Sequence, residues 1–129
     1  MEKRQVNPWT WQDRLGFSHA WVLDGTKKLI LLAGQASVSA EGELVGEGDF
    51  EAQVRQVFAN LSTVLEHCGA GLDSIFKLVV YLTDIRDLAT YERVVAETLP
   101  GPKPAGTAVE VSSLAVPGML VEVDATAVL

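Results

Sequence analysis

Apolar residues recur three or four positions apart in two stretches of the chain, which is typical of helices that bury one face. The first stretch begins after Asp49, a residue type that caps helix N-termini, and runs for about five turns to Gly69, which we expect at the C′ position. The second stretch follows Asp84 and Asp87 and stops before the sequence Pro-Gly-Pro at 100–102. The apolar positions are Phe50, Val54, Val57, Phe58, Leu61, Val64, Leu65 and Cys68 in the first stretch, and Leu88, Tyr91, Val94, Val95 and Leu99 in the second.

Short runs of apolar and β-branched residues predict the strands. Ala20–Leu23 and Lys28–Ala33 lie on either side of the turn sequence Asp24-Gly25, so we expect these two strands to form a hairpin. Residues 1–16 are mostly polar and contain Pro8, which favours an extended or looped segment. Further strands are predicted at Ile75–Leu82, Thr107–Val111 and Met119–Val128, and Ser37–Glu43 is predicted to be a loop or a short strand.

The order of these elements indicates a single α+β domain over residues 1–129, with residues 1–16 as an N-terminal extension that is rich in aromatic residues. Two helices of this length cover only one face of a sheet of about five or six strands. The strands at Leu29–Ala33 and Ile75–Leu82 are apolar on both faces, so their other face needs a cover. We expect another subunit to supply it by packing sheet against sheet.

The composition narrows the classes of function. With 10 basic and 17 acidic residues, the net charge is −7, which disfavours binding to a nucleic acid or to an anionic membrane. The chain is 48% hydrophobic with a mean hydropathy of +0.21, which excludes a disordered chain. Cys68, His19 and His67 lack the spacing of a metal site, so neither a metal nor a cofactor is expected. No apolar run is long enough to cross a membrane and no leader-like segment follows Met1, so we expect a cytoplasmic protein.

Several short motifs follow one another along the chain. They are Ala33-Gly34-Gln35 after a strand, Gly48-Asp49 with Gln53 at the start of the first helix, Asn60-Leu61 within it, the segment from Lys77 to Asp84, and Leu120–Ala125 near the C-terminus. Together, their order and spacing resemble the RidA/YjgF family, also described as L-PSP endoribonuclease-like or translation-inhibitor-like, from Gly16 to the C-terminus. Trp9, Trp11, Gln12 and Gly16 resemble the N-terminal signature of a subgroup outside the best-studied branch.

The resemblance implies a chorismate-mutase-like α+β fold, with a mixed sheet of about five or six strands and two helices on one face. It also implies a homotrimer with a barrel-like core, with the helices outside and ligand clefts between neighbouring subunits. Members of the best-known branch hydrolyse reactive 2-imino or 2-enamino acids to 2-oxo acids and ammonia. In that branch an arginine clamps the substrate carboxylate, and a glutamate near the end of the last strand positions water.

Transferring that site to this chain assigns the water-positioning role to Glu122. The arginine position, in a Pro-Ala-Arg segment of the branch, is Gly106 here. Two further polar positions also differ, with Ala33 in place of a serine and Ser18 in place of a tyrosine. Because a bidentate arginine is the natural clamp for a carboxylate, these differences predict an altered substrate range.

The predicted site has one catalytic residue, Glu122, which strand alternation places on the same face as Asp124. In an apolar cleft its carboxylate would act as a general base or position water, and otherwise it bonds to the backbone or faces solvent. Gln35 either presents its amide to a ligand or caps a loop, and Lys103 or Arg14 could supply a cation from another direction. The predicted substrate-binding residues are Gln35, Gly34, Ala33, Ser18, Phe17 and Gly106.

The aromatic residues near the N-terminus have two interpretations. Trp9, Trp11, Phe17 and Trp21 either wall an apolar pocket that suits an uncharged or aromatic ligand, or pack on the body of the protein or on a neighbouring subunit. His19, beside the Ser18 position, either lines the cleft or packs with them.

Three functions follow from these residues. The first is a RidA-like hydrolase, a deaminase of imines or enamines with an altered substrate range. The second is a non-catalytic homotrimer that binds a small metabolite between its subunits. The third is an endoribonuclease or translation inhibitor, which the acidic charge and the absence of a His-based hydrolytic cluster from the sequence disfavour.

Overall fold

The structure is a computed structural model that describes residues 1–11, 13, 15 and 17–129. A five-stranded mixed sheet dominates it, with β7 (Val121–Val128) and β5 (Ile75–Leu82) at the centre. β6 (Ala105–Glu110) runs parallel to β5, whereas β5 and β7 are antiparallel. The short strands β3 (Leu29–Leu31) and β4 (Gln35–Ala36) pair antiparallel with the other edge of β7. The expected α+β class and mixed sheet are confirmed.

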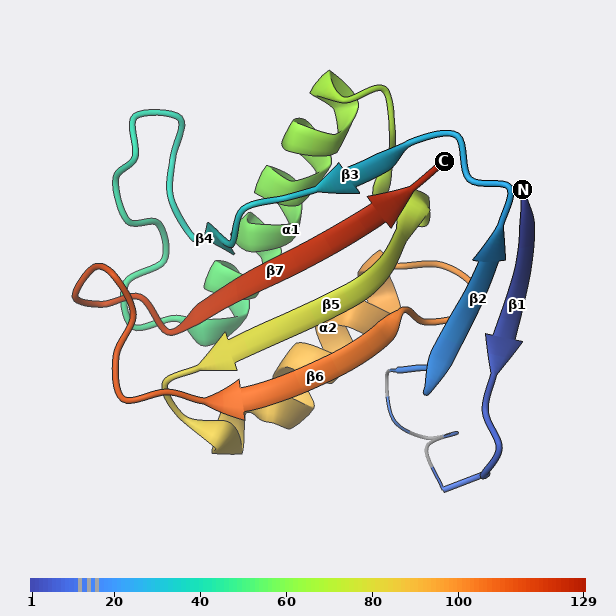
Figure 1. Cartoon of the computed structure of the whole chain (residues 1–129). Coiled ribbons are helices and arrows are strands. Elements are labelled where there is room, and N and C mark those ends of the chain that lie inside the picture. Colours follow the sequence, from blue (N-terminus) through green and yellow to red (C-terminus); the bar gives the residue numbers. More distant parts are fainter. Residues whose placement is uncertain (12, 14, 16) are drawn as a thin grey trace.

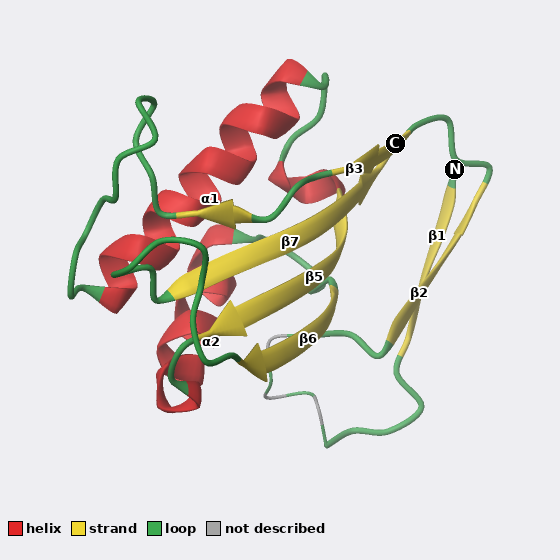
Figure 2. Ribbon diagram, turned by 60° about the vertical axis from the view of Figure 1, so that its left-hand side comes forward, coloured by secondary structure: helices red, strands yellow, loops and turns green. Residues whose placement is uncertain are grey.

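Both helices, α1 (Phe50–His67) and α2 (Leu88–Thr98), lie on one face of the sheet, as predicted (Figures 1 and 2). Asp49 caps α1, because its side chain accepts a hydrogen bond of 3.0 Å from the backbone N of Ala52. Gly69 follows α1 with a φ of +75°, which confirms the predicted C′ position. Two short 3-10 helices, η1 (Leu72–Ser74) and η2 (Ile85–Asp87), precede β5 and α2.

The hydrophobic core lies between the helices and the sheet. Val54 and Phe58 of α1 are buried in the same cluster as Val121 and Val123 of β7. Buried and half-buried residues alternate along β7 from Val121 to Thr126, because successive side chains of a strand point to opposite faces. The polar residues of β7 therefore lie on the face away from the helices.

The predicted hairpin between Ala20–Leu23 and Lys28–Ala33 is wrong. β2 (Ala20–Asp24) pairs instead with β1 (Glu2–Val6) in a separate two-stranded sheet, and β3 pairs with β7. Gly25 does take a turn conformation, with a φ of +71°, but a turn sequence does not select the partner of either strand. Beside β7, Ile30 of β3 becomes buried, and this burial favours the observed pairing.

The strand β1 forms in the segment for which the sequence predicts only an extended or looped path. Its residues from Glu2 to Gln5 are exposed and polar, so no apolar alternation marks the strand in the sequence. The backbone N of Ser18 donates to the carbonyl of Pro104 at 2.9 Å, which joins the two-stranded sheet to the start of β6 (Figure 1). The segment Ser37–Glu43 is a loop with one isolated β-bridge, between Val38 and Leu44.

The face of the sheet opposite the helices is open in the single chain. Leu29 and Leu31 on this face are 63% and 75% exposed, and Val79 and Tyr81 of β5 are half-buried. Exposed leucines at such fractions favour burial against another molecule. The expected packing of sheet against sheet between subunits stays a prediction.

Candidate functional site

Glu122 lies in an open cleft at the start of β7, which we name the Glu122 cleft. Its volume is about 400 Å³, and the loop before β4, the end of β5 and the loop after β6 form its walls. The lining residues are Gly34, Tyr81, Val111, Ser113, Leu114, Ala115, Glu122 and Asp124.

Gly34 and Glu122 touch in this cleft. A Cβ at position 34 would clash with the carboxylate oxygen Oε1 of Glu122 and would lie 3.1 Å from its Cδ. The φ of Gly34 is not in the left-handed region, so close approach is the reason for a glycine here. Two of the predicted site residues are therefore brought together, and Gly34 leaves the Glu122 carboxylate room to lie against the backbone.

The Glu122 cleft has an acidic lining. Glu122 and Asp124 lie on the same face of β7, and Tyr81 is opposite Glu122 in the register of β5 and β7. No Lys or Arg side chain lines the cleft among the residues that the structure describes. Two carboxylates attract a protonated nitrogen group, accept a hydrogen bond from a neutral N–H group and repel an anionic group.

Gln35 and Ala33 flank this cleft without lining it. The Gln35 side chain donates from Nε2 to the carbonyl of Ala33 at 3.2 Å, and the Gln35 backbone pairs with Val123 of β7. Of the two predictions for Gln35, this bond matches the amide that caps a loop. The assignment of Gln35 and Ala33 as substrate-binding residues stays a prediction.

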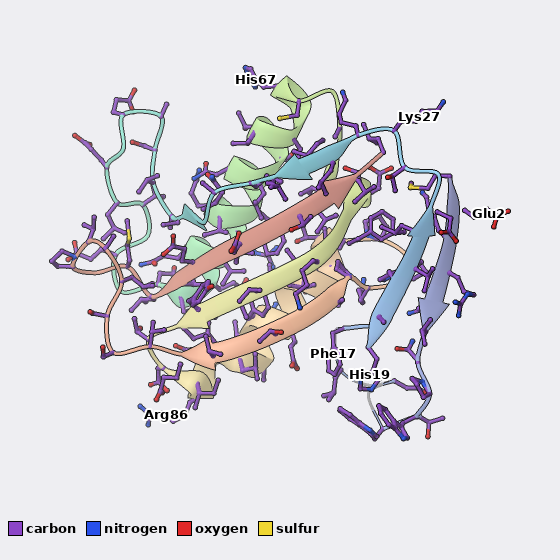
Figure 3. All side chains as sticks on the ribbon, in the orientation of Figure 1. Glu2, Phe17, His19, Lys27, His67 and Arg86 are labelled. Atoms are coloured by element: carbon purple, nitrogen blue, oxygen red, sulfur yellow. The ribbon has the colours of Figure 1, made fainter. Side chains whose placement is uncertain are left out.

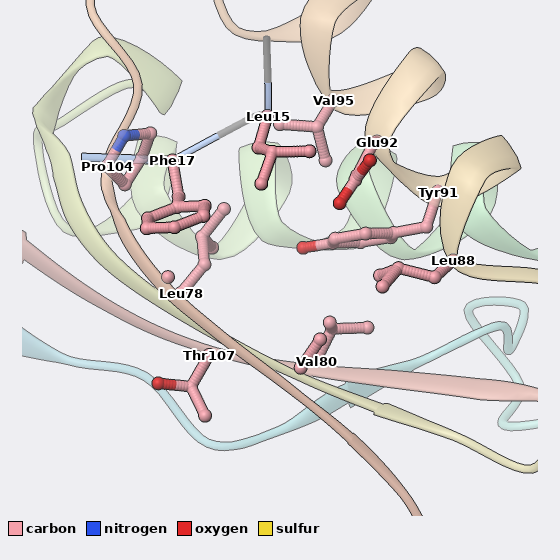
Figure 4. A pocket seen from close by; sticks show the side chains of 12 residues that line it. Leu15, Phe17, Leu78, Val80, Leu88, Tyr91, Glu92, Val95, Pro104 and Thr107 are labelled. Carbon is pink, nitrogen blue, oxygen red and sulfur yellow. The ribbon is translucent and has the colours of Figure 1, made fainter. Parts of the chain in front are cut away.

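A second cavity, which we name the Phe17 pocket, lies between α2 and the strands β5 and β6 (Figure 4). Its volume is about 210 Å³, and its walls are mainly apolar. The lining residues are Leu15, Phe17, Leu78, Val80, Leu88, Tyr91, Glu92, Val95, Pro104, Gly106, Thr107 and Ala108.

Phe17 and Gly106 are in contact within this pocket. A Cβ at position 106 would lie 3.1 Å from the Cβ of Phe17, which is tighter than an ordinary contact. Phe17 therefore packs where a side chain at position 106 would begin. Two further predicted site residues are brought together, but away from Glu122, since the two cavities have no lining residue in common.

Ser18 is buried, and two protein groups already use its hydroxyl. The Ser18 Oγ accepts from Gln5 Nε2 at 2.7 Å and donates to the carbonyl of Lys103. The Lys103 ammonium in turn donates to the carbonyl of Leu99 at the end of α2, and it lines neither cavity. The other cation considered from the sequence, Arg14, lies outside the described residues, as do Gln12 and Gly16.

The N-terminal aromatic residues form a cluster around His19, which Figure 3 shows beside Phe17 where β2 begins. The His19 ring makes edge contacts with Trp9, Trp11 and Phe17 at centroid distances of 5.0, 4.8 and 5.4 Å. Trp21 packs separately, on Phe76 at 5.2 Å, and donates to the carbonyl of Lys103. Of these four aromatic residues only Phe17 lines the pocket, and Trp21 packs on Phe76. Trp9 and Trp11 contact the His19 ring but stay largely exposed, at 58% each, so neither of the two interpretations describes all four residues in the single chain.

Tyr91 is the pocket residue that sequence reasoning missed, because its place in the apolar stripe of α2 predicted a core residue. It is 6% exposed, and its hydroxyl points along the pocket toward Phe17, with the Glu92 carboxylate nearby (Figure 4). Burial above all, and then the charge of Glu92, raise the pKa of the Tyr91 phenol well above its usual range. The hydroxyl therefore stays protonated and available as a donor.

Three comparisons with known proteins identify the family of this chain and structures that resemble it. The family described as Endoribonuclease L-PSP matches residues 12–129. The chain belongs to this family, the RidA/YjgF family. A RutC family protein of Pyrococcus abyssi is 40% identical over 99 residues, which cover 76% of each chain. A crystal structure of a Rid family protein from Yersinia pestis has a TM-score of 0.90 at 36% identity, covering 100% of both chains. RidA from a Psychrobacter species has a TM-score of 0.74 at 33% identity, covering 88% of both chains.

The name of one relative gives its location, the mitochondrion. The mitochondrial protein Mmf1 of Schizosaccharomyces pombe is 37% identical over 101 residues, covering 77% of this chain and 61% of its own. In this RidA/YjgF family member, no helix of the described part is long and apolar enough to cross a membrane. Across the same residues, no three His, Cys, Asp or Glu side chains are grouped to hold a metal ion.

Proposed function

We propose that this RidA/YjgF-family protein hydrolyses the C=N bond of small imines or enamines that lack a carboxylate. The observation that carries this proposal is the contact of Glu122 with Gly34 inside an acidic, water-accessible cleft. Glu122 takes a proton from a water molecule, the water oxygen bonds to the imine carbon, and the nitrogen receives the proton. In the collapse of the adduct, Glu122 accepts the hydroxyl proton and passes it to the nitrogen, the C=O bond forms and the C–N bond breaks, so that imine and water become a carbonyl compound and ammonia.

The substrate class follows from the charges around the cleft. Asp124 lies on the same strand face as Glu122 and stabilises a protonated C=N group. An arginine clamp for a carboxylate would have no counterpart at Gly106, where Phe17 fills the space. These features support imines derived from simple amines over 2-imino acids.

The proposal includes a homotrimer with sites between its subunits. In one chain the predicted site residues separate into the Glu122 cleft and the Phe17 pocket, so a single site that uses both groups needs two chains. The exposed Leu29 and Leu31 support burial of the open face in such an assembly. The cytoplasmic location expected from the sequence stays a prediction.

Trapping of imines by semicarbazide tests the proposal. A flavin amine oxidase would supply an imine without a carboxylate, and an amino-acid oxidase would supply a 2-imino acid. The protein should lower trapping of the first more than of the second. Glu122→Gln should reduce the rate by about 100-fold or more, because it removes the base. Glu43→Gln, on an exposed loop, is the matched control and should leave the rate unchanged.

A non-catalytic metabolite-binding trimer is the second candidate. It is favoured by the hydroxyl of Ser18 and the amide of Gln35, which already bond within the chain instead of facing a substrate. If the wild-type protein accelerates hydrolysis of neither imine, the hydrolase proposal is rejected in favour of this candidate.

A further inference from the structure

We infer that Tyr81 determines the specificity of the Glu122 cleft, because its ring receives the protonated C=N group of the substrate. This inference deepens the proposed function, on which it rests for the identity of the substrate. It concerns a residue of the cleft that lies outside the predicted site.

Tyr81 lies beside Glu122 on the open face of the sheet. The two residues are directly opposite each other in the antiparallel register of β5 and β7, and Asp124 is opposite Val79, two positions along β5 from Tyr81. The Cβ atoms of directly opposite residues are about 4.5–5.5 Å apart, and diagonal neighbours at about 7–8 Å are still within reach of an aromatic side chain. Tyr81, Glu122 and Asp124 all line the cleft, so one aromatic ring and two carboxylates border the same space.

The Tyr81 side chain has no competing contact that would keep a ligand from it. It is half-buried, and among the described residues no other aromatic ring and no cation lies against its ring. The hydroxyl of Tyr81 makes no hydrogen bond within the same part of the chain. The other tyrosine, Tyr91, is 6% exposed and packs 6.3 Å from the ring of Phe58. Of the two tyrosines, only Tyr81 therefore has a ring that a ligand of the cleft can reach.

The ring and the carboxylates attract the same kind of group. The face of an aromatic ring carries partial negative charge and attracts a cation within about 6 Å of its centre. A protonated C=N group is planar, so it can lie flat on the Tyr81 ring while its N–H donates to the carboxylate of Glu122 or Asp124. A neutral imine gains only the hydrogen bond, and a 2-imino acid brings a carboxylate that both acids repel. Tyr81 therefore favours imines that are protonated and lack a carboxylate.

Acetamidinium tests the inference without any reaction, because it is a planar cation with the C=N geometry of a protonated imine. NMR titration of the ¹⁵N-labelled full chain should give saturable shifts of the backbone amides around Glu122. Acetamide, the neutral molecule of the same shape, should bind at least about tenfold more weakly, because it lacks the attraction to the carboxylates and to the ring. Absence of saturable acetamidinium binding would overturn the inference.

Variants with and without a ring at position 81 separate the ring of Tyr81 from its hydroxyl. Tyr81→Leu and Tyr81→Met should each weaken acetamidinium binding by about fivefold, whereas Tyr81→Phe should stay within about twofold of wild type. A thermal melt checks that each variant is folded, and two different ringless side chains keep the test valid if one of them fails to fold. An equal loss in Tyr81→Phe and Tyr81→Leu would assign the effect to the hydroxyl and overturn the role of the ring.

Val109→Ala is the matched control, since Val109 pairs with Tyr81 on the other side of β5 but does not line the cleft. It should leave the affinity for acetamidinium unchanged. In the imine-trapping assay, Tyr81→Leu should raise KM about fivefold with little change in kcat, because the ring contributes binding in the ground state and in the transition state alike. Acetamidinium binding that Tyr81→Leu weakens, without hydrolysis of either imine by wild type, would reject only the proposed function. Hydrolysis at the same rate and KM in wild type and Tyr81→Leu would reject only the inference about Tyr81.

Discussion

The Glu122 cleft and the Phe17 pocket belong to one sheet but differ in what they can do. The cleft lies at the start of β7, is open and acidic, and has a carboxylate that rests against Gly34. The pocket lies under α2, is mainly apolar, and has a buried hydroxyl. The comparison shows that one α+β sheet places chemistry on its open face and an apolar cavity on its helical face, because alternate residues of each strand serve opposite faces.

The largest expected effect concerns Gln53, which holds the segment that leads into β7 and so into the Glu122 cleft. Gln53 is fully buried, donates to the carbonyls of Gly46 and Gly118, and accepts from the backbone N of Leu120 at 2.9 Å. Gln53→Ala should lower the free energy of unfolding by about 3 kcal/mol or more, because three backbone groups lose their hydrogen-bond partner and a fully buried side chain is removed. Urea unfolding measures this loss.

Gln56→Ala is the control for Gln53→Ala, since Gln56 lies on the same helix, is half-buried, and its side chain bonds to the Asn60 side chain and to no backbone group of the described residues. It should cost less than about 1 kcal/mol. Similar losses in the two variants would contradict the role given to Gln53.

The next effect breaks the Glu122 cleft without unfolding the chain. Gly34→Ala should push the Glu122 carboxylate from its position, because the new Cβ would overlap its oxygen. The displaced side chain end is mobile, so stability should change little, but the rate of imine hydrolysis should fall by about 100-fold. The imine-trapping assay together with a thermal melt distinguishes these effects. Ala40→Ser, in an exposed loop, is the control and should alter neither the stability nor the rate. Full activity in Gly34→Ala would show that the contact between Gly34 and Glu122 is dispensable.

A smaller effect sharpens the comparison by giving the pocket a cation. Gly106→Arg alone should be poorly accommodated, since Phe17 occupies the first position of the new side chain. Combined with Phe17→Ala, the arginine has room, and affinity for 4-fluorobenzoate should rise by at least about tenfold through a charge-assisted bond. ¹⁹F NMR titration of both variants measures this gain. Equal affinity of the single and double variants for 4-fluorobenzoate would show that Phe17 does not limit the space for a side chain at position 106.

The smallest effect concerns the start of α2, the helix that carries Tyr91. Hydrogen bonds from the Arg86 side chain and then its backbone lower the pKa of Asp84 to about 2. A lowered pKa stabilises the folded chain above the unfolded value of about 4, and this contribution is lost as the pH falls toward 2. NMR titration should find Asp84 ionised at pH 3, and Asp84→Asn should destabilise the chain slightly at pH 7 but not near pH 2. A pKa of Asp84 at its ordinary value would contradict the interaction between Asp84 and Arg86.

The helices were predictable from local signals, and the strand pairing was not. Asp49 and Gly69 mark the two ends of α1 by their own chemistry, so these ends match the prediction. The turn at Gly25 marks a change of direction but carries no information about partners, and β1 has no apolar alternation at all. Both errors concern pairings between strands, which depend on what each strand buries against distant residues.

The candidate site was likewise predictable only as far as local patterns of residues reach. Alternation along β7 was enough to place Glu122 and Asp124 on one face, and the motif around Gly34 was enough to name it as a site residue, but its contact with Glu122 is visible only in the structure. The hydrophobic stripe of α2 predicted Tyr91 as a core residue and gave no sign that its hydroxyl faces a cavity. A cavity forms where elements that are distant in the chain leave space between them, so no local pattern of residues predicts it.

The class of fold, the two helices with their ends, and the family to which the chain belongs follow from local patterns in the chain, because periodicity, caps and motifs are properties of nearby residues. Three contacts depend on the folded arrangement: Gly34 touches Glu122, Phe17 fills the space beside Gly106, and the Tyr91 side chain lines a pocket. These contacts join residues far apart in the chain, and their geometry is set by how the sheet, the helices and the N-terminal ribbon pack on one another.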